Sequence, residues 1–433
     1  MYCQLEVLRH CFPSSVPRIL EELPESLDET YERILREIRK PNQGHAHRLL
    51  QCLVAAVRPL EVKELAEILA FDFNSEGIPK LNLCWRWEDQ EEAVLSACSS
   101  LVMIVKDGDS RVVQFSHFSV KEFLTADRIA EPIRDVSRYH IRLEAAHTIL
   151  VRACLGILLQ LDDRIVRGGM KSFPLARYAA QYWPTHTRIG NVSSRIKEGM
   201  ECLFDADKPH FATWLWIYNE DRYEWDRSMS TICPEKPEAI PLYYAARLGF
   251  RDLAERLIAE HPEHVNARGG LKTSPIHVAA SIGHSDILSL LLEHGADVNG
   301  QGPNDDTPLH QASRYARVEA GQILLNRGAD IDAQNAFNRT ALTYVALNGN
   351  AEFARMLLEC GPAIDVRDSN DWTPLHHAAY NGRTEVVRLL LERGADAHVR
   401  DSGDKTPSDF GTEMGHHEIV ELLSGCDASS AKK

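Results

Sequence analysis

Apolar residues in the second half of the chain recur at helical spacing. Leu290 and Leu291 follow Ile287 by three and four residues, and the same spacing returns over 384–392. Such residues share one face of a helix, which a neighbouring element can cover. A shorter apolar segment precedes each of these stretches, and most of these segments begin with Ser-Pro or Thr-Pro. Because proline suits the first turn of a helix, we predict pairs of helices throughout this half.

These helix pairs recur with a fixed period. The first helix of a pair starts at positions 33 residues apart, namely Ser274, Thr307, Thr340, Thr373 and Thr406. Glycines with the same period follow the second helix, where a left-handed residue can end it: Gly295, Gly328, Gly361 and Gly394. Ile240 begins the series 34 residues before Ser274. A period of this length predicts a solenoid of about six stacked units, with degenerate units at its ends.

The repeated letters resemble those of the ankyrin repeat. Thr-Pro-Leu-His at 373–376 and Gly-Ala-Asp at 394–396 carry this resemblance, which covers about residues 239–425. In that family the threonine and histidine of each start bond to each other and to the next unit. The resemblance therefore implies structural roles for Ser274 with His277, Thr307 with His310, Thr373 with His376, and for Gly295, Gly328 and Gly394.

Three units depart from this start. Tyr243, Thr343 and Asp409 stand where a histidine is expected. We interpret the first and last units as caps, whose outer faces need not match. The fourth unit, 340–365, is internal, so its departure makes it either the weakest unit or a contact site.

The first half of the chain predicts a winged helix. Ser26 and Glu29 form a capping box before the first helix. Asp107-Gly108 is a favourable tight turn between two short apolar runs. We expect helices over 27–40, 44–57, 62–70 and 88–99, followed by strands over 101–105 and 112–115.

This half also resembles the segment that follows the nucleotide-binding domain of fungal NACHT–ankyrin proteins, which are STAND/NLR-like receptors. The matching segments are 3–6, 23–35, 58–60, 98–102, 117–124 and 174–184. The resemblance implies a switch that a nucleotide opens and whose ankyrin end senses a partner. The chain has no Gly-x-x-x-x-Gly-Lys-Ser/Thr sequence to hold phosphates. We therefore predict that it lacks the NACHT core and binds no nucleotide.

The predicted fold is mostly α. Five segments follow from these patterns: a remnant of the end of a NACHT-type domain at 1–24, a winged-helix-like α+β segment at 25–130, a helical connector at 131–235, the ankyrin α-solenoid at 236–427, and a disordered tail at 428–433. We expect the apolar helix 143–159 to be buried between domains. An aromatic cluster precedes the repeats and is interpreted as packing that covers the first unit, rather than as a ligand face: Trp214, Trp216, Tyr218, Tyr223 and Trp225.

Composition narrows the function. The net charge of −15 disfavours binding to nucleic acid or to an anionic membrane surface. The helix before the predicted hairpin is acidic over 88–92, so we expect this winged helix not to bind DNA. Ten cysteines without a Cys-x-x-Cys pair indicate reduced, mostly buried thiols. With neither a signal peptide nor a membrane-spanning run, the sequence predicts an intracellular protein of the cytoplasm, the nucleus or both.

No pattern of residues predicts catalysis or a cofactor. His-Pro-Glu-His at 261–264 and His-His-Glu at 416–418 lack the helical spacing of a zinc protease, and we interpret them as solvated surface without a metal. Gly-x-Ser-x-Gly is missing, and no spacing singles out a catalytic triad. We expect no enzyme. A catalytic pocket within 131–235 is the alternative to that expectation.

The variable positions of the repeats predict the function. Aromatic residues and arginines at exposed positions are the usual anchors of protein interfaces. We expect units three to five to form the partner site, with these candidates on loop tips and inner helices: Arg314, Tyr315, Phe337, Arg339, Tyr344, Leu347, Trp372, His377, Tyr380 and Lys405. We expect a non-catalytic adaptor that binds another protein, with a transcriptional co-regulator that binds a transcription factor as the candidate role. The alternative is the sensor half of a split NACHT-type immune or incompatibility receptor.

Overall fold

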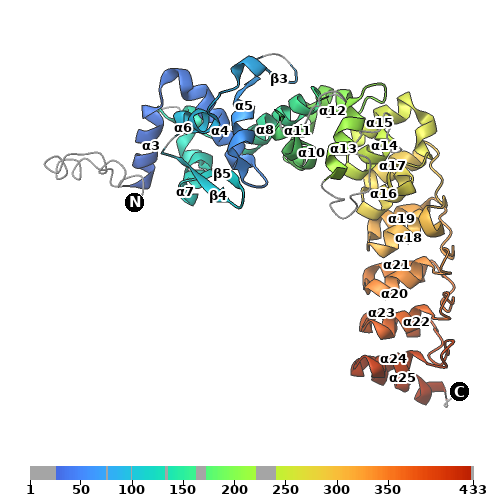
Figure 1. Ribbon diagram of the computed structural model, residues 1–433. Helices are drawn as coiled ribbons and strands as arrows, with labels where there is room; N and C mark the ends of the chain where they lie inside the picture. The colour runs from blue at the N-terminus through green and yellow to red at the C-terminus, as the bar shows by residue number, and fades with distance from the viewer. Residues whose placement is uncertain are drawn as a thin grey trace. The chain divides into compact units, whose positions relative to one another are not determined.

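The computed structural model describes residues 26–74, 77–98, 100–131, 135–161, 172–220 and 240–430 (Figure 1). The chain divides into two compact units, residues 1–237 and 238–433. The remnant expected at 1–24 lies outside the described residues. Within the described ranges, no helix is both long and apolar enough to cross a membrane.

The first unit begins with a winged helix, as the sequence predicts. Its helices and strands, in chain order, are α3 (Leu27–Glu37), α4 (Gln43–Ala55), β1 (Leu60–Glu61), α5 (Val62–Leu69), β2 (Phe71–Asp72), β3 (Lys80–Leu81), α6 (Gln90–Cys98), β4 (Val102–Asp107), β5 (Ser110–Phe115) and α7 (Phe118–Thr125). The antiparallel sheet has the order β1-β5-β4, so the predicted hairpin gains a third short strand. The hairpin of β2 and β3 was not predicted.

Local sequence explains where these helices start. The Ser26 hydroxyl accepts the N–H of Glu29 at 3.2 Å, which caps α3. Glu64 accepts the N–H of Glu61 at 2.8 Å at the start of α5, and Arg58 holds the same carboxylate with bonds of 2.7 and 2.9 Å. Glu64 is almost fully buried, and a buried carboxylate without a partner costs much free energy. The ion pair with Arg58 offsets this cost.

The connector helices pack on the winged helix within the first unit. They are α8 (Leu143–Leu158), α10 (Leu175–His186), α11 (Val192–Arg195), α12 (Lys197–Leu203) and α13 (His210–Glu220). Helix α8 is the apolar helix of the sequence, and it contacts α4 of the winged helix and α10 of the connector. Buried Glu67 of α5 accepts the Leu175 N–H at 2.8 Å, which fixes the start of α10.

One member of the aromatic cluster before the repeats, Trp214, packs within the connector. Trp214 is buried in the connector, with ring centroids 5.8 Å from Trp183 and 5.5 Å from Phe204. Its Nε1–H donates to the Ala180 carbonyl at 3.0 Å. Trp214 therefore belongs to the core of the compact unit of residues 1–237. Tyr223 and Trp225 lie outside the described residues.

The second unit is the predicted solenoid, and Figure 1 shows its helix pairs stacked in a row. The pairs are α14 (Pro241–Leu248) with α15 (Arg251–Glu260), α16 (Pro275–Ile282) with α17 (Ser285–Glu293), α18 (Pro308–Arg314) with α19 (Val318–Asn326), α20 (Ala341–Asn348) with α21 (Ala351–Glu359), α22 (Pro374–Tyr380) with α23 (Thr384–Glu392), and α24 (Pro407–Glu413) with α25 (His417–Ser430). Helix α25 continues to Ser430, into the tail expected to be disordered. Residues 431–433 lie outside the described residues.

The threonine and histidine of a unit bond as a pair and reach the next unit. The Thr307 N–H donates to His310 Nδ1 at 3.0 Å, so the proton of this imidazole lies on Nε2. That Nε2–H donates to the Arg339 carbonyl of the next unit at 2.8 Å. The corresponding distances are 3.0 Å from His277 to the Asp306 carbonyl and 3.3 Å from His376 to the Lys405 carbonyl.

A second tie between repeat units is not predicted from the sequence. Asn or Asp recurs at Asn266, Asn299, Asp332 and Asp365. Each side chain accepts a backbone N–H of the following unit, from Asp297, Asp330, Ala363 and Asp396, at 2.8, 2.8, 2.8 and 3.3 Å respectively. The 33-residue spacing of these residues was the available signal.

The cysteines depart from the expectation of mostly buried thiols. Among the residues whose side chains are described, Cys52, Cys98 and Cys154 are buried and three others are exposed. Burial raises the pKa of the Cys52 and Cys98 thiols to about 12, which keeps them protonated and unreactive at neutral pH.

Candidate protein-binding surface

A buried carboxylate organises the candidates of units three and four. Asp306 accepts bonds from Arg314 Nη2 and Asn335 Nδ2, both at 2.6 Å. The Arg314 guanidinium also lies 4.5 Å above the ring of Tyr344 and bonds its hydroxyl at 2.5 Å. Arg314 is therefore held in one orientation, with its side chain still 37% exposed.

Tyr344 is not the exposed contact that the sequence predicts. It is only 6% exposed, because its hydroxyl bonds Asn335 at 2.8 Å beside Asp306. Burial, reinforced by the Asp306 charge, raises the pKa of Tyr344, so the hydroxyl keeps its proton. Its role is to position Arg314. The signal available in the sequence was its place in the inner-helix row that also contains Phe410.

A second buried carboxylate organises units four and five. Asp368 accepts bonds from Arg339 Nε at 3.2 Å and from His377 Nε2 at 2.9 Å. Burial opposes ionisation of Asp368, but bonds from the Asn370 N–H and from His377 outweigh it, and the pKa of Asp368 is lowered. Arg339 remains 27% exposed at the surface beside this carboxylate.

His377 also departs from the predicted exposure. It is 3% exposed, and burial lowers its pKa below the ordinary value of 6.5 despite the neighbouring Asp368. A neutral His377 that donates Nε2–H to Asp368 fits this burial. His377 therefore helps to fix Asp368 rather than offering a contact.

An aromatic cluster covers units five and six. The Trp372 ring lies 4.5 Å from Phe410 and 5.4 Å from Tyr380, and its Nε1–H donates to Asp401 at 3.0 Å. Lys405 Nζ lies 5.3 Å from the Phe410 ring. Phe410 was missed by the sequence analysis because the sixth unit was interpreted as a cap.

The candidates that remain open to solvent are aromatic. Tyr315 is 52% exposed, Phe337 45% and Tyr380 38%, whereas Leu347 is half-buried. Met414 and Ile282 share the repeat position of Tyr315 and are also exposed. We use the name aromatic surface for a fixed set of these side chains: Tyr315, Phe337, Trp372 and Tyr380, with Arg314, Arg339 and Lys405 beside them.

The winged helix presents an acidic face. A cavity of about 780 Å³ lies between the starts of α5 and α6 and the β4–β5 turn. It is lined by Glu61, Val62, Lys63, Glu88, Asp89, Gln90, Glu91, Asp109, Ser110 and Arg111. Its two cations are paired, Lys63 with Glu61 at 2.8 Å and Arg111 with Glu91. The carboxylates of this face would repel the phosphates of a nucleic acid, because Lys63 and Arg111 already pair with acidic side chains.

Comparisons with known proteins find the same two parts of the chain, a winged helix and a series of repeats. Ankyrin repeats match in three overlapping copies, residues 242–335, 320–401 and 342–432. Residues 31–133 match the GPI inositol-deacylase winged helix domain. The chain is similar to the azaphilone pigments biosynthesis cluster protein L of Monascus ruber, 33% identical over 290 residues. That alignment covers 63% of this chain and 60% of the relative. The chain thus carries a winged helix domain followed by ankyrin repeats, and its kinship with NACHT proteins stays a prediction.

Proposed function

We propose that this chain is a non-catalytic adaptor that binds another protein through the aromatic surface. Ankyrin repeats indicate a protein partner. The observation that carries the choice of surface is the exposure of Tyr315, Phe337 and Tyr380 on three consecutive units. Burial of these large rings by a partner removes apolar surface from water and so stabilises the complex.

The arginines beside these rings support the same surface. Arg314 and Arg339 are already held by Asp306 and Asp368. A side chain ordered in advance loses less conformational entropy when it contacts a partner. Tyr, Trp and Arg are also the residues that most often dominate interface energies. We infer that units three to five supply the anchors and that the winged helix supplies a second docking surface.

The leading role is regulatory. The name of the relative places that protein in a pigment biosynthesis cluster. A chain that binds a transcription factor rather than DNA fits this setting, because the winged helix face is acidic. A co-purified transcription factor and nuclear localisation support this role.

The alternative role is the sensor half of a split NACHT-type receptor. The order of a winged helix before ankyrin repeats favours it, because the sequence resemblance implies the same order. Co-purification with a separate NTPase supports this alternative. We expect no saturable ATP or GTP binding by the chain itself, which calorimetry measures directly.

The test of the surface is a pair of matched double variants. Tyr315→Ala with Phe337→Ala removes two rings from the aromatic surface, and Leu143→Ala with Ile189→Ala removes two apolar side chains of the connector that are 50% and 38% exposed. Affinity purification and mass spectrometry identify partners of the unaltered chain. Binding of a purified partner to all three chains is then measured by calorimetry.

We expect the repeat variant to bind at least about tenfold more weakly, since loss of an interface anchor typically costs more than 1.4 kcal/mol. Circular dichroism should show an unchanged melting temperature, because exposed rings contribute little to the fold. Equal losses in both variants, or no loss in the repeat variant, would reject the aromatic surface as the partner site.

A further inference from the structure

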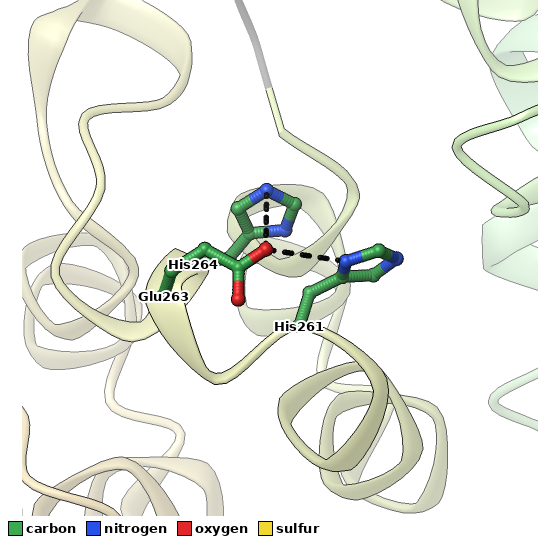
Figure 2. Close-up of side chains that lie close together, drawn as sticks. All are labelled: His261, Glu263 and His264. Atoms are coloured by element: carbon green, nitrogen blue, oxygen red, sulfur yellow. Dashed lines mark hydrogen bonds and ion pairs between the residues drawn. The ribbon is translucent and has the colours of Figure 1, made fainter.

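Two histidines and a glutamate converge at the end of the first repeat. Figure 2 shows His261 and His264 directed toward the same oxygen of Glu263. The Glu263 Oε1 atom lies 3.3 Å from His261 Nδ1 and 4.0 Å from His264 Nε2. All three ligand atoms lie within 4.8 Å of one another. The arrangement presents two imidazole nitrogens and one carboxylate oxygen to a common point.

The local backbone produces this convergence. Helix α15 ends at Glu260, and the His261 N–H closes its last turn on the Leu257 carbonyl at 2.9 Å. A short 3-10 helix, η7 (Pro262–Val265), follows at once. His261 is the N-cap of η7, and its carbonyl accepts the His264 N–H at 3.0 Å. The two imidazole rings are accordingly stacked, with centroids 4.9 Å apart.

The sequence of this segment lacks the spacing of a zinc protease and indicates a solvated surface where a helix gives way to a loop. On an α-helix, the pair of histidines in a zinc protease stands four residues apart with glutamate between them. His261 and His264 stand three residues apart, so that comparison rejected them. The structure changes the conclusion, because the chain turns between the two histidines, with the His264 N–H bonded to the His261 carbonyl at 3.0 Å.

We propose that His261, Glu263 and His264 form a site for a divalent transition-metal ion, with Zn²⁺ as the cation that best fits these donors. Zinc is bound by histidine nitrogen and carboxylate oxygen at about 2.0–2.2 Å, which places tetrahedral ligands roughly 3.3 Å apart. The separation of His261 from Glu263 already has this value, whereas the His264 nitrogen lies 4.0 Å from the Glu263 oxygen and must move closer by rotation of its side chain. A water molecule supplies the fourth ligand from the exposed side.

The position of the site gives the metal a structural effect. Asn266 follows two residues after His264, and its amide nitrogen donates to the Gly295 carbonyl of the second ankyrin repeat at 2.9 Å. Its carbonyl oxygen accepts the Asp297 N–H at 2.8 Å. A metal that holds the end of α15 to η7 therefore orders the segment that joins the first two units. Binding to the folded chain alone raises the free energy of unfolding.

The competing interpretation is an ordinary hydrated surface cluster. In that case His261 and Glu263 share a hydrogen bond and metal binds no better here than at other exposed histidines. Exposed Cys84, Cys202 and Cys360 could also bind added zinc. The test therefore compares variants of the full chain and counts the ions that each one binds.

The experiment titrates ZnCl₂ into the full chain by calorimetry, after dialysis against a chelator. We expect one ion to be lost from the stoichiometry in His261→Ala with His264→Ala. Glu263→Gln should weaken the same event at least about tenfold, because changing even a neighbour of a zinc ligand costs 10–100-fold. His416→Ala with His417→Ala is the matched control, since it removes two histidines elsewhere on the same solenoid and should keep that ion.

Cobalt supplies an independent readout. Co²⁺ in a four-coordinate site absorbs visible light far more strongly than hydrated Co²⁺, and this absorption should vanish in the His261→Ala, His264→Ala chain. Zinc should also raise the melting temperature of the unaltered chain more than that of this variant. Equal stoichiometry and equal thermal shifts in both chains would overturn the proposal, as would adventitious binding only, at millimolar zinc.

Discussion

Two neighbouring junctions of the solenoid are built differently. Between units three and four, His310 donates to the Arg339 carbonyl, and Asp306 accepts from Asn335. Between units four and five the histidine is replaced by Thr343, whose hydroxyl bonds Thr340 of its own unit at 3.2 Å. The hydroxyl is too short to reach the next unit, so this junction lacks the histidine tie.

The second junction keeps the side-chain bond of the first junction but makes it an ion pair. Arg339 of the fourth unit donates to buried Asp368 of the fifth at 3.2 Å, at the repeat positions that Asp306 and Asn335 hold in the first junction. The Ser369 N–H donates to the Phe337 carbonyl at 3.0 Å, as the Ala336 N–H donates to the Asn304 carbonyl at 2.8 Å. The replacement of the repeat histidine by Thr343 has two consequences. It removes one tie between units, and it makes a candidate partner contact, Arg339, part of the tie that remains.

The largest expected effect on this comparison comes from Asp368→Ala. The substitution leaves Arg339 and buried His377 without their shared acceptor at the junction that has no histidine tie. We expect the free energy of unfolding to fall by about 3 kcal/mol, as when one partner of a buried ion pair is removed. Urea unfolding followed by circular dichroism measures this loss.

Glu352→Ala, at an exposed position of α21, is the control for Asp368→Ala and should change stability by less than about 0.5 kcal/mol. The same measurement on Asp306→Ala should give a smaller loss than Asp368→Ala, because His310 still ties its junction. A larger loss at Asp306 would contradict the proposed difference between the two junctions.

Acid should weaken both junctions together. Burial lowers the pKa of four repeat histidines below 6.5: His277, His310, His376 and His377. The unfolded chain then binds protons that the folded chain excludes, so stability is complete above 6.5 and falls as pH decreases toward the lowered values. The lowered pKa of Asp368 keeps that carboxylate ionised in this window.

Urea midpoints measured at about pH 7.5 and about pH 5 test this sign, with a lower midpoint expected in acid. In the compact unit of residues 1–237, burial and, second, the charge of His147 lower the pKa of His186 to about 3. The stability of that part should therefore also fall in acid. His310→Gln removes one titrating group and should reduce the pH dependence. A solenoid equally stable at both values would show that these histidines are protonated without cost.

His310→Ala should have a moderate effect at neutral pH. It removes the bond to the Arg339 carbonyl and leaves a buried space beside Tyr344, whose ring lies 5.9 Å away. We expect a loss of about 1–3 kcal/mol, the cost of leaving a buried polar group unpaired. The Asp306–Asn335 bond should keep the junction assembled, so the helix content at low temperature should not change.

Thr343→His should have the smallest effect, and of opposite sign. It restores the residue that the other internal units use, and the new imidazole can reach the fifth unit as His310 reaches the fourth. One added hydrogen bond typically contributes about 1 kcal/mol. If the substitution instead destabilises the chain, the space beside Thr343 is too small for a ring, and the departure reflects packing rather than a missing tie.

The sequence predicted the fold where a residue type has one dominant use. Periodic Thr-Pro starts and closing glycines indicated the helix pairs, and Asp107-Gly108 indicated the hairpin of the winged helix. Helix ends were less accurate, since the first helix ends at Glu37 rather than near Lys40. The unpredicted strands β1 to β3 are two residues long, too short to show an alternating pattern.

The candidate site was predictable only in part. Exposed Tyr315, Phe337 and Tyr380 follow from the repeat positions, but the burial of Tyr344 and His377 does not. These two residues are buried because Asp306 and Asp368 lie inside, and an aspartate in a polar loop gives no sign of that. The sequence predicts solvated surface at 261–264, because the letters alone do not show that the chain turns into a 3-10 helix directly after His261.

The line of Asn and Asp side chains that runs from Asn266 to Asp365 allows whole units to be exchanged. Each of these side chains accepts a peptide N–H, which every residue except proline offers, and Asn266 and Asn299 also donate to a main-chain carbonyl. Excision of residues 300–332 would place Asn299 where Asp332 now stands, opposite the Ala363 N–H. A chain shortened or lengthened by one full period keeps this contact, whereas the carboxylates at 306 and 368 serve particular neighbours. New partners could therefore arise by shuffling units without redesigning the spine that joins them.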